Sequence, residues 1–240
     1  GEFDGCNYKL SDLNLVPSGE DSTGLFCVIA SGGIVKNLIL DQANYMYSGT
    51  NVGLLVGKNG GTIINCHVSG EISYDYYESY RGGLAGVNQA GGGIYDCSSS
   101  VSVSTPGYGL GGLIGYNYGT VQRCSATGDV YGGNCVGGLA GYSNGGSLSN
   151  CFSTSDVHAT TGFAGGLAGY FTSSSMDQCF STGKVTGNND SGGLYGSGWD
   201  CTIQNSFSTG IVIGGNRSAS LIGGQSSGTV NGCFSVGTVS

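Results

Sequence analysis

Ten cysteines are the residues of this 240-residue sequence that could most readily do chemistry, as disulfides or as metal ligands. No close Cys-x-x-Cys pair is present, which argues against a zinc site. Six cysteines instead recur at one position of a repeated unit: Cys66, Cys97, Cys124, Cys151, Cys179 and Cys233. Equivalent side chains on stacked parallel strands are about 4.8 Å apart, whereas a relaxed disulfide needs about 3.8 Å between its Cβ atoms. We therefore predict a column of free, buried thiols.

The remaining cysteines fall outside this column, at Cys6, Cys27, Cys135 and Cys201. A disulfide between Cys6 and Cys27, near the N-terminal end, is an open alternative. The sequence does not decide whether Cys135 or Cys201 pairs.

Histidines and carboxylates could serve acid-base chemistry, but their pattern gives little support for it. His67 and His158 are the only histidines, at non-equivalent positions, and no third residue completes a nucleophile and base pair around either. One outward position holds Glu71, Ser102, Asp129, Asp156 and Lys184 in successive units. Paired carboxylates there could bind calcium or act in polysaccharide cleavage. Because Lys184 follows Asp156 and no neighbouring outward acid accompanies them, we expect a solvated stripe, no catalytic residue, no metal and no cofactor.

Tyrosines are the better candidates for binding. One stretch longer than the repeat requires contains Tyr74, Tyr76, Tyr77 and Tyr80; a second overlong stretch covers residues 43–47. Exposed loop tyrosines suit protein or glycan recognition, because large amphipathic rings give contact area at low entropy cost. The alternative is a loop that only covers the edge of a coil. The other regularly spaced aromatics are expected to pack in two ladders: Tyr116, Tyr142 and Tyr170, and Phe152, Phe180, Phe207 and Phe234.

The elements that position these residues repeat along the chain. A leucine, usually after Gly-Gly, recurs every 26 to 30 residues, at positions 25, 54, 84, 113, 139, 167, 194 and 221. The cysteine position follows it, and six residues later comes an aliphatic residue: Ile72, Val103, Val130, Val157, Val185, Val212 or Val239. Three such landmarks predict three short strands per unit.

Within residues 124–130, small or apolar side chains alternate with hydroxyls and a carboxylate, as in a strand with one buried face. The residue before the cysteine is Asn or Asp in four units (Asn65, Asp96, Asn150 and Asn205), which suits a corner with left-handed backbone. Units that cannot bury an apolar face alone must stack. We predict an all-β, parallel β-solenoid of about eight coils, right-handed by the crossover rule. Residues 1–23 would form an incomplete coil or cap, and residues 24–240 one elongated repeat domain.

Composition excludes several function classes. The net charge is −8, and no cluster of Lys and Arg is present, which argues against nucleic acid and anionic membranes. No apolar run is long enough to cross a bilayer and no signal peptide is visible, so we expect an excised piece of a longer protein.

The pattern Gly-Gly-Leu-Ala-Gly-Tyr, a glycine turn, aliphatic-x-Asn-Cys and Ser-Thr-Gly-x-Val resembles the GLUG repeat. Its Gly-Leu-x-Gly core stands at residues 83–86, 112–115, 138–141, 166–169 and 193–196, with departures at 53–56 and at Ser220-Leu221. The resemblance implies an extracellular or bacterial cell-surface protein, adhesin-like or the non-catalytic part of an immunoglobulin A peptidase. The peptidase motif His-Glu-x-x-His is absent from the sequence.

These observations lead us to expect a non-catalytic spacer or adhesion module that binds host protein or glycan. Two alternatives stay open. A carbohydrate-active β-helix enzyme, a lyase or a hydrolase, would need a cleft with converging carboxylates. An ice-binding solenoid would need two aligned threonine columns on a flat face, and the sequence supplies one: Thr127, Thr154, Thr182 and Thr209.

Overall fold

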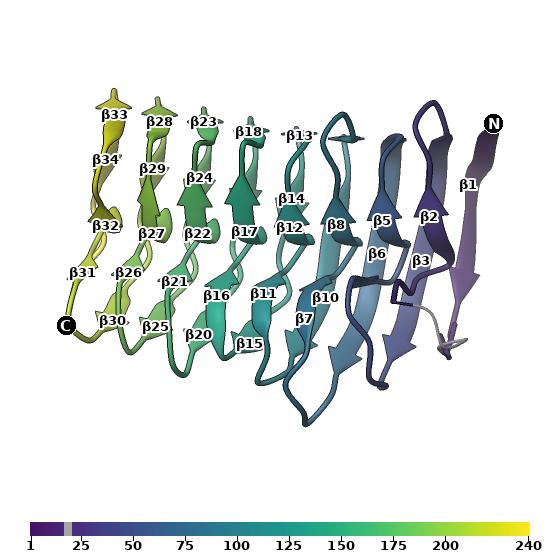
Figure 1. Cartoon of the computed structure of the whole chain (residues 1–240), viewed down its shortest axis with the longest axis horizontal. Coiled ribbons are helices and arrows are strands. Elements are labelled where there is room, and N and C mark those ends of the chain that lie inside the picture. Colours follow the sequence, from purple (N-terminus) through teal and green to yellow (C-terminus); the bar gives the residue numbers. More distant parts are fainter. Residues whose placement is uncertain (17–20) are drawn as a thin grey trace.

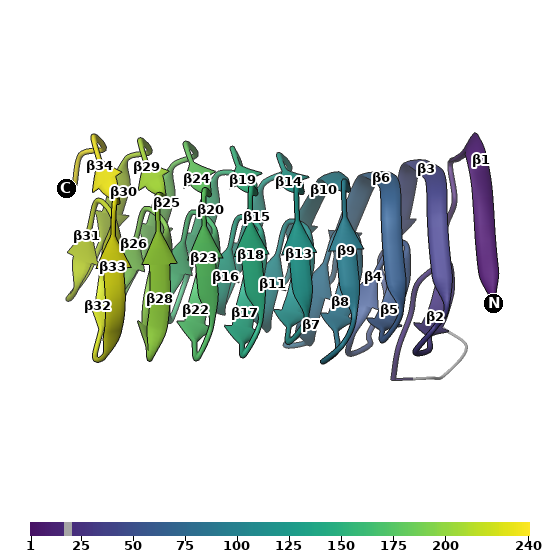
Figure 2. The same cartoon turned by 90° about the horizontal axis from the view of Figure 1, so that it is seen from above.

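A computed structural model describes residues 1–16 and 21–240. These residues form 34 β-strands and three sheets, and all the strand pairs are parallel. No helix in the described part of the chain is long and apolar enough to cross a membrane. Eight coils stack into a rod with β1 at one end and β31 to β34 at the other (Figures 1 and 2). The predicted parallel β-solenoid of about eight coils is confirmed.

Each coil visits the three sheets in the same order. Sheet B contains β4 (Val52–Gly53), β7 (Ser79–Gly82), β11 (Tyr108–Gly111), β16 (Asn134–Gly137), β21 (Ala164–Gly165), β26 (Ser191–Gly192) and β31 (Ser218–Ala219). Sheet C contains β2 (Phe26–Ile29), β5 (Val56–Asn59), β8 (Ala85–Asn88), β12 (Ile114–Asn117), β17 (Ala140–Asn144), β22 (Ala168–Thr172), β27 (Tyr195–Trp199) and β32 (Ile222–Gln225). The repeated Gly-Gly-Leu segment forms the corner between these two sheets.

Sheet A completes each coil. Its first strands are β1 (Glu2–Ser11), β3 (Ile34–Tyr45), β6 (Thr62–Ser73), β9 (Gly93–Tyr95) and β10 (Ser98–Ser104). The next four coils contribute three pieces each: β13 (Thr120–Gln122), β14 (Ser125–Ala126) and β15 (Val130–Gly132); β18 (Ser147–Ser149), β19 (Phe152–Ser153) and β20 (Val157–Ala159); β23 (Ser175–Asp177), β24 (Phe180–Ser181) and β25 (Val185–Gly187); and β28 (Cys201–Gln204), β29 (Phe207–Ser208) and β30 (Val212–Gly214). The last coil contributes two, β33 (Gly228–Asn231) and β34 (Phe234–Ser235).

We predicted three strands per coil, and each coil does contribute to three sheets. The central coils, however, have five strands, because the corner before the cysteine divides their part of sheet A. Asn65, Asp96, Asn150 and Asn205 have φ between 47° and 54°, as predicted for left-handed corner residues. Except in the first long strands, where β3 and β6 run through the corner, this turn interrupts the hydrogen-bonded ladder.

The direction of winding is visible in Figure 1. The chain rises along the nearer face through β2, β5 and β8, and descends along the farther face through β3, β6 and β10. Since it advances from β1 towards β31 to β34, the solenoid is right-handed, as the crossover rule predicts.

The core is built from columns of equivalent residues. Leu84, Leu113, Leu139, Leu167 and Leu194 are all completely buried, and the repeated valines and cysteines form parallel columns beside them. At the N-terminal end, β1 pairs with β3 and Leu15 is buried. A domain boundary after residue 23 stays a prediction.

Candidate binding surface

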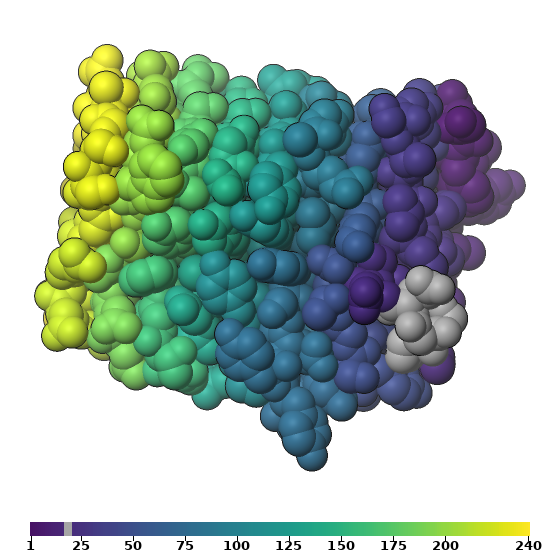
Figure 3. Space-filling model, in the orientation of Figure 1, coloured from purple at the N-terminus to yellow at the C-terminus, as the bar shows by residue number. Residues whose placement is uncertain are grey.

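The predicted tyrosine loop connects β6 to β7 and projects from the side of the rod, in blue at the lower edge of Figure 3. Tyr76 and Tyr77 are 70% and 66% exposed, whereas Tyr74 and Tyr80 are half-buried. The ring centroids of Tyr74 and Tyr76 are 5.5 Å apart. Tyr80 belongs to a different group of rings, described below. The loop thus presents two largely exposed rings, and the half-buried ring of Tyr74 lies beside one of them.

A buried arginine anchors this loop. Arg81, on β7, is completely buried, and its Nη2 atom donates hydrogen bonds to the carbonyl oxygens of Tyr47 (2.9 Å) and Gly49 (3.3 Å). Its guanidinium carbon lies 5.5 Å from the ring centroid of Tyr45 and 5.6 Å from that of Tyr74, which is cation–π distance. The two overlong stretches of the sequence therefore meet at one cation.

The environment of Arg81 is unusual for a charged group. Its Nε and Nη1 atoms have no hydrogen-bond partner, and no carboxylate of the described residues forms an ion pair with it. Burial lowers the pKa of Arg81 because desolvation penalises the charged form. Sequence reasoning missed this residue. The sequence repeat could have identified it, because Arg81 occupies the position at which the neighbouring coils have the buried aliphatic residues Val52 and Leu110.

Tyr80 opens a second aromatic surface, which we call the tyrosine strip: Tyr80, Tyr108, Tyr116, Tyr118, Tyr142 and Tyr170. The rings of Tyr80 and Tyr116 stack at 5.0 Å, and those of Tyr116 and Tyr142 are 4.6 Å apart. Tyr170 continues the row at 4.9 Å from Tyr142. The expected ladder of Tyr116, Tyr142 and Tyr170 is confirmed by their register on β12, β17 and β22. It lies at the surface, with its rings half-buried, and not in the core cluster.

Comparisons with known proteins agree with this architecture. The GLUG motif matches residues 48–73, 106–131 and 132–157. These three segments are GLUG repeats. The first match includes the divergent segment at 53–56, and the other two include the cores at 112–115 and 138–141. Because the remaining cores form coils of the same kind, the GLUG repeat corresponds to one turn of the solenoid.

The chain is similar to a curated protein and to a solved structure. Halomucin from Haloquadratum walsbyi (strain DSM 16790 / HBSQ001) is 33% identical over 101 residues, which is 42% of this chain and 1% of halomucin. A crystal structure of a candidate immunoglobulin A1 protease from Bacteroides ovatus superposes with a TM-score of 0.55 and 20% identity, over 95% of this chain and 69% of that one. At that identity the second likeness shows the fold alone.

The second predicted aromatic ladder consists of phenylalanines. Phe152, Phe180, Phe207 and Phe234 stack with centroids 5.0 to 5.1 Å apart and ring planes within 6° of parallel. The threonine column of Thr127, Thr154, Thr182 and Thr209 is exposed beside it. The ice-binding alternative needs a second threonine column. The register puts Ser125 at the adjacent outward position in the coil of Thr127, and phenylalanine there in the coils of Thr154, Thr182 and Thr209.

The acidic side chains of the outward stripe form hydrogen bonds between neighbouring coils. The Oδ1 atom of Asp129 accepts a hydrogen bond from the N–H of Asp156 (3.2 Å), and Asp156 likewise accepts one from the N–H of Lys184 (2.8 Å). These residues border a surface hollow of about 340 Å³ that Tyr131 and His158 also line, their rings stacked 4.9 Å apart. Within residues 1–16 and 21–240, no three His, Cys, Asp or Glu side chains gather to hold a metal.

His67, the other histidine, is far along the chain from this hollow and has polar partners of its own. Its Nδ1 atom is 2.8 Å from Ser98 Oγ, and its Nε2 atom is 3.2 Å from the corner residue Asn65. The structure does not bring the two histidines into one site.

All ten cysteines of the chain are free thiols. The predicted column is present: the N–H of Cys66 donates to Cys97 Sγ, and that of Cys97 to Cys124 Sγ, both at 3.4 Å. The open alternative of a Cys6–Cys27 disulfide is not realised, and both thiols are exposed. Burial raises the pKa of Cys135 to about 12 and that of Cys201 to about 11.

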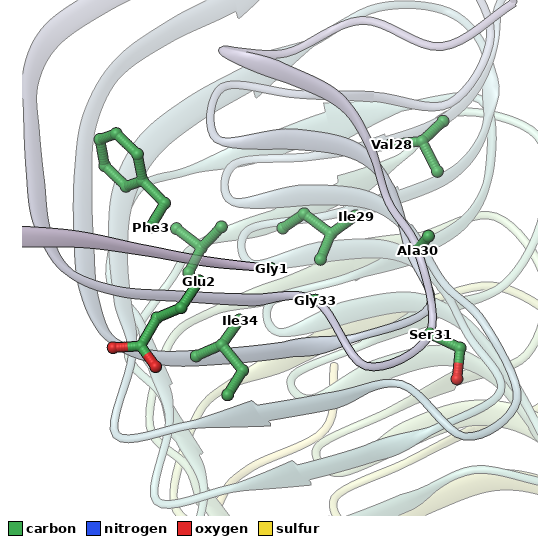
Figure 4. A pocket seen from close by; sticks show the side chains of 10 residues that line it. Gly1, Glu2, Phe3, Val28, Ile29, Ala30, Ser31, Gly33 and Ile34 are labelled. Carbon is green, nitrogen blue, oxygen red and sulfur yellow. The ribbon is translucent and has the colours of Figure 1, made fainter.

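A groove of about 360 Å³ opens at the N-terminal end between β1 and the β2–β3 turn (Figure 4). Ile29 and Ile34 lie along it, whereas the carboxylate of Glu2 points away from them. Glu2 forms an ion pair with Lys36 at 2.7 Å. With this carboxylate already paired and no other charged lining residue, the groove lacks the converging polar groups of a small-molecule site.

Proposed function

We propose that this chain is a non-catalytic module of a larger extracellular or bacterial cell-surface protein, which acts as a spacer and binds host protein or glycan. The observation that carries the binding role is the pair Tyr76 and Tyr77, about two-thirds exposed on a loop held from inside by Arg81. An anchored loop loses less conformational entropy on binding than a free one. Aromatic residues presented in this way are typical of recognition surfaces.

The spacer role follows from the ladders. Each coil is hydrogen-bonded to its neighbours through three parallel sheets, so the rod has a fixed direction and a length proportional to the number of repeats. The similarity to halomucin supports placement at a surface or outside the cell.

The test is a binding array of host matrix proteins and glycans, probed with the intact chain and with a Tyr76→Ser, Tyr77→Ser variant. The control is a Tyr8→Ser, Tyr131→Ser variant, which removes two exposed tyrosines elsewhere on the rod. Binding by the intact chain and the control, with loss in the loop variant, is the expected result. Absence of binding by the intact chain would refute the adhesive role and leave the spacer role alone.

A further inference from the structure

The tyrosine strip has the features of a binding surface distinct from the loop. We infer that it is a track for a linear, uncharged polysaccharide lying along the rod axis. This inference rests on the proposed function and gives it a ligand class. Three properties of the strip carry it: the orientation of the rings, the absence of charge and the repeat along the axis.

Ring orientation separates the strip from the phenylalanine ladder. The phenylalanine planes lie within 6° of parallel, so each ring covers the face of the next. In the strip, only Tyr80 and Tyr116 are stacked, at 19°, whereas Tyr116 and Tyr142 meet at 84° and Tyr142 and Tyr170 at 33°. Tilted rings leave part of their faces open to a ligand. The slightly positive C–H groups of a sugar pack on the negative face of an aromatic ring, so the strip suits sugars where the ladder does not.

The rings of the strip carry phenol groups and no ionised side chain. Burial raises the pKa of Tyr142 to about 12 and raises the pKa of Tyr108 and Tyr118 as well, so the hydroxyls stay neutral donors. Neutral hydroxyls match the hydroxyls of a sugar. The net charge of −8 disfavours anionic polymers such as uronates or sulfated glycans.

The strip repeats in the direction in which a polymer would lie. Tyr116, Tyr142 and Tyr170 occupy the same register on adjacent strands, about 4.8 Å apart along the axis. A chain of identical sugar units can place successive units on successive rings, which multiplies a weak contact. Beyond Tyr170 the strip reaches a hollow of about 230 Å³ that the half-exposed Trp199 and Gln225 also line. Arg217 borders this hollow too, with its charge paired to Asp190 at 2.8 Å.

The test is native electrophoresis in gels that contain hydroxyethylcellulose, xyloglucan or galactomannan, with polygalacturonate as the charged comparison. We expect at least one neutral polysaccharide to retard the intact chain and polygalacturonate not to do so. Tyr116→Ala with Tyr142→Ala should weaken binding at least about tenfold. The matched control, Phe152→Ala with Phe180→Ala, should weaken it less than about twofold, since it removes as much aromatic surface from another face.

A second variant keeps the inference testable if Tyr116→Ala with Tyr142→Ala fails to fold. Tyr118→Ala with Trp199→Ala changes two exposed side chains at the borders of the strip, and it should also weaken retardation. No retardation in any neutral gel, or equal effects of the strip and phenylalanine variants, would overturn the inference.

Failure of the polysaccharide track would not refute the proposed adhesive module. A protein ligand found in the array and lost with Tyr76→Ser, Tyr77→Ser, without any polysaccharide binding, would keep the adhesive module and refute the track. Polysaccharide binding that persists in that loop variant would separate the track from the loop.

Discussion

The guanidinium carbon of Arg81 lies 5.6 Å from the ring centroid of Tyr74, in a completely buried position where no carboxylate of residues 1–16 or 21–240 forms an ion pair with it. It also lies 5.5 Å from the ring centroid of Tyr45. A cation close to two aromatic rings replaces part of its lost hydration with their negative faces. Arg81 thereby ties the exposed tyrosine loop to the core through Tyr74.

Replacing Arg81 with methionine should loosen the loop without weakening the rod. The substitution removes a buried charge that forms no ion pair with a described carboxylate, which offsets the loss of its hydrogen bonds to Tyr47 and Gly49. The free energy of unfolding should therefore change by less than about 1 kcal/mol. Chymotrypsin cleavage after Tyr76 and Tyr77 should accelerate about tenfold as local stability falls. Arg123→Met is the control, because Arg123 is exposed and pairs with Asp96 on another coil. Equal loop cleavage in both variants would contradict the anchoring role.

A column of buried asparagines should contribute strongly to stability. Asn59 Nδ2 donates to Asn88 Oδ1 (2.9 Å), Asn88 Nδ2 donates to Asn117 Oδ1 (2.8 Å), and all three side chains are fully buried. Asn88→Ala removes both of these hydrogen bonds, so Asn59 Nδ2 keeps only its long bond to the carbonyl oxygen of Gly93 (3.4 Å) and Asn117 Oδ1 keeps only the N–H of Gly119 (3.2 Å). The substitution should lower the free energy of unfolding by about 1 to 3 kcal/mol. The exposed Asn231→Ala should cost less than about 0.5 kcal/mol. Guanidinium unfolding measures both, and similar values would argue against the column.

Two glycines should respond differently to alanine. A Cβ on Gly138 would lie 2.3 Å from the carbonyl oxygen of Gly166 and 2.3 Å from Ser153 Oγ, so Gly138→Ala should cost about 3 kcal/mol. Gly145 has φ 69° and open space around it, so Gly145→Ala should cost only about 1 kcal/mol of backbone strain. Thermal unfolding measures the order, and a reversed order would show that coils are not packed this closely at the Gly-Gly-Leu corner.

Alkaline pH should destabilise the fold through Tyr142. Burial, with smaller effects from Tyr116 and Tyr170, raises its pKa to about 12, whereas an unfolded tyrosine has a pKa of about 10. Below pH 10 both states keep the proton, so stability is unaffected. Between pH 10 and about 12 the unfolded state loses its proton and the folded state does not, so stability falls as pH rises. Tyr142→Phe should make that fall shallower in unfolding measured from pH 9 to 12; an unchanged slope would contradict the assignment.

Much of the fold could be predicted because the sequence repeats. In a parallel solenoid, residues one period apart become neighbours, so the spacing of Leu139 or Cys151 gives their contacts directly. Asn59, Asn88 and Asn117 recur at intervals of 29 residues, and the same reasoning could have found their column.

The candidate site was less predictable, because the loops do not follow the period. The four tyrosines predicted as one patch divide between two surfaces: Tyr76 and Tyr77 project on the loop, while Tyr80 stacks on Tyr116 of the next coil. Where an inserted segment folds depends on packing with residues outside its own repeat, as Arg81 and Tyr45 illustrate.

The sequence by itself determined the class of fold, the register of the coils and the columns of the core, because each follows from one period and one alternation of side chains. Only the tertiary structure decided which tyrosines are exposed, that a buried cation holds the loop, and that the ladder of Tyr116, Tyr142 and Tyr170 lies at the surface beside Tyr80. The physical reason is that repeat contacts link equivalent positions, whereas the loop contacts link positions that share no spacing and meet only once the coils have stacked.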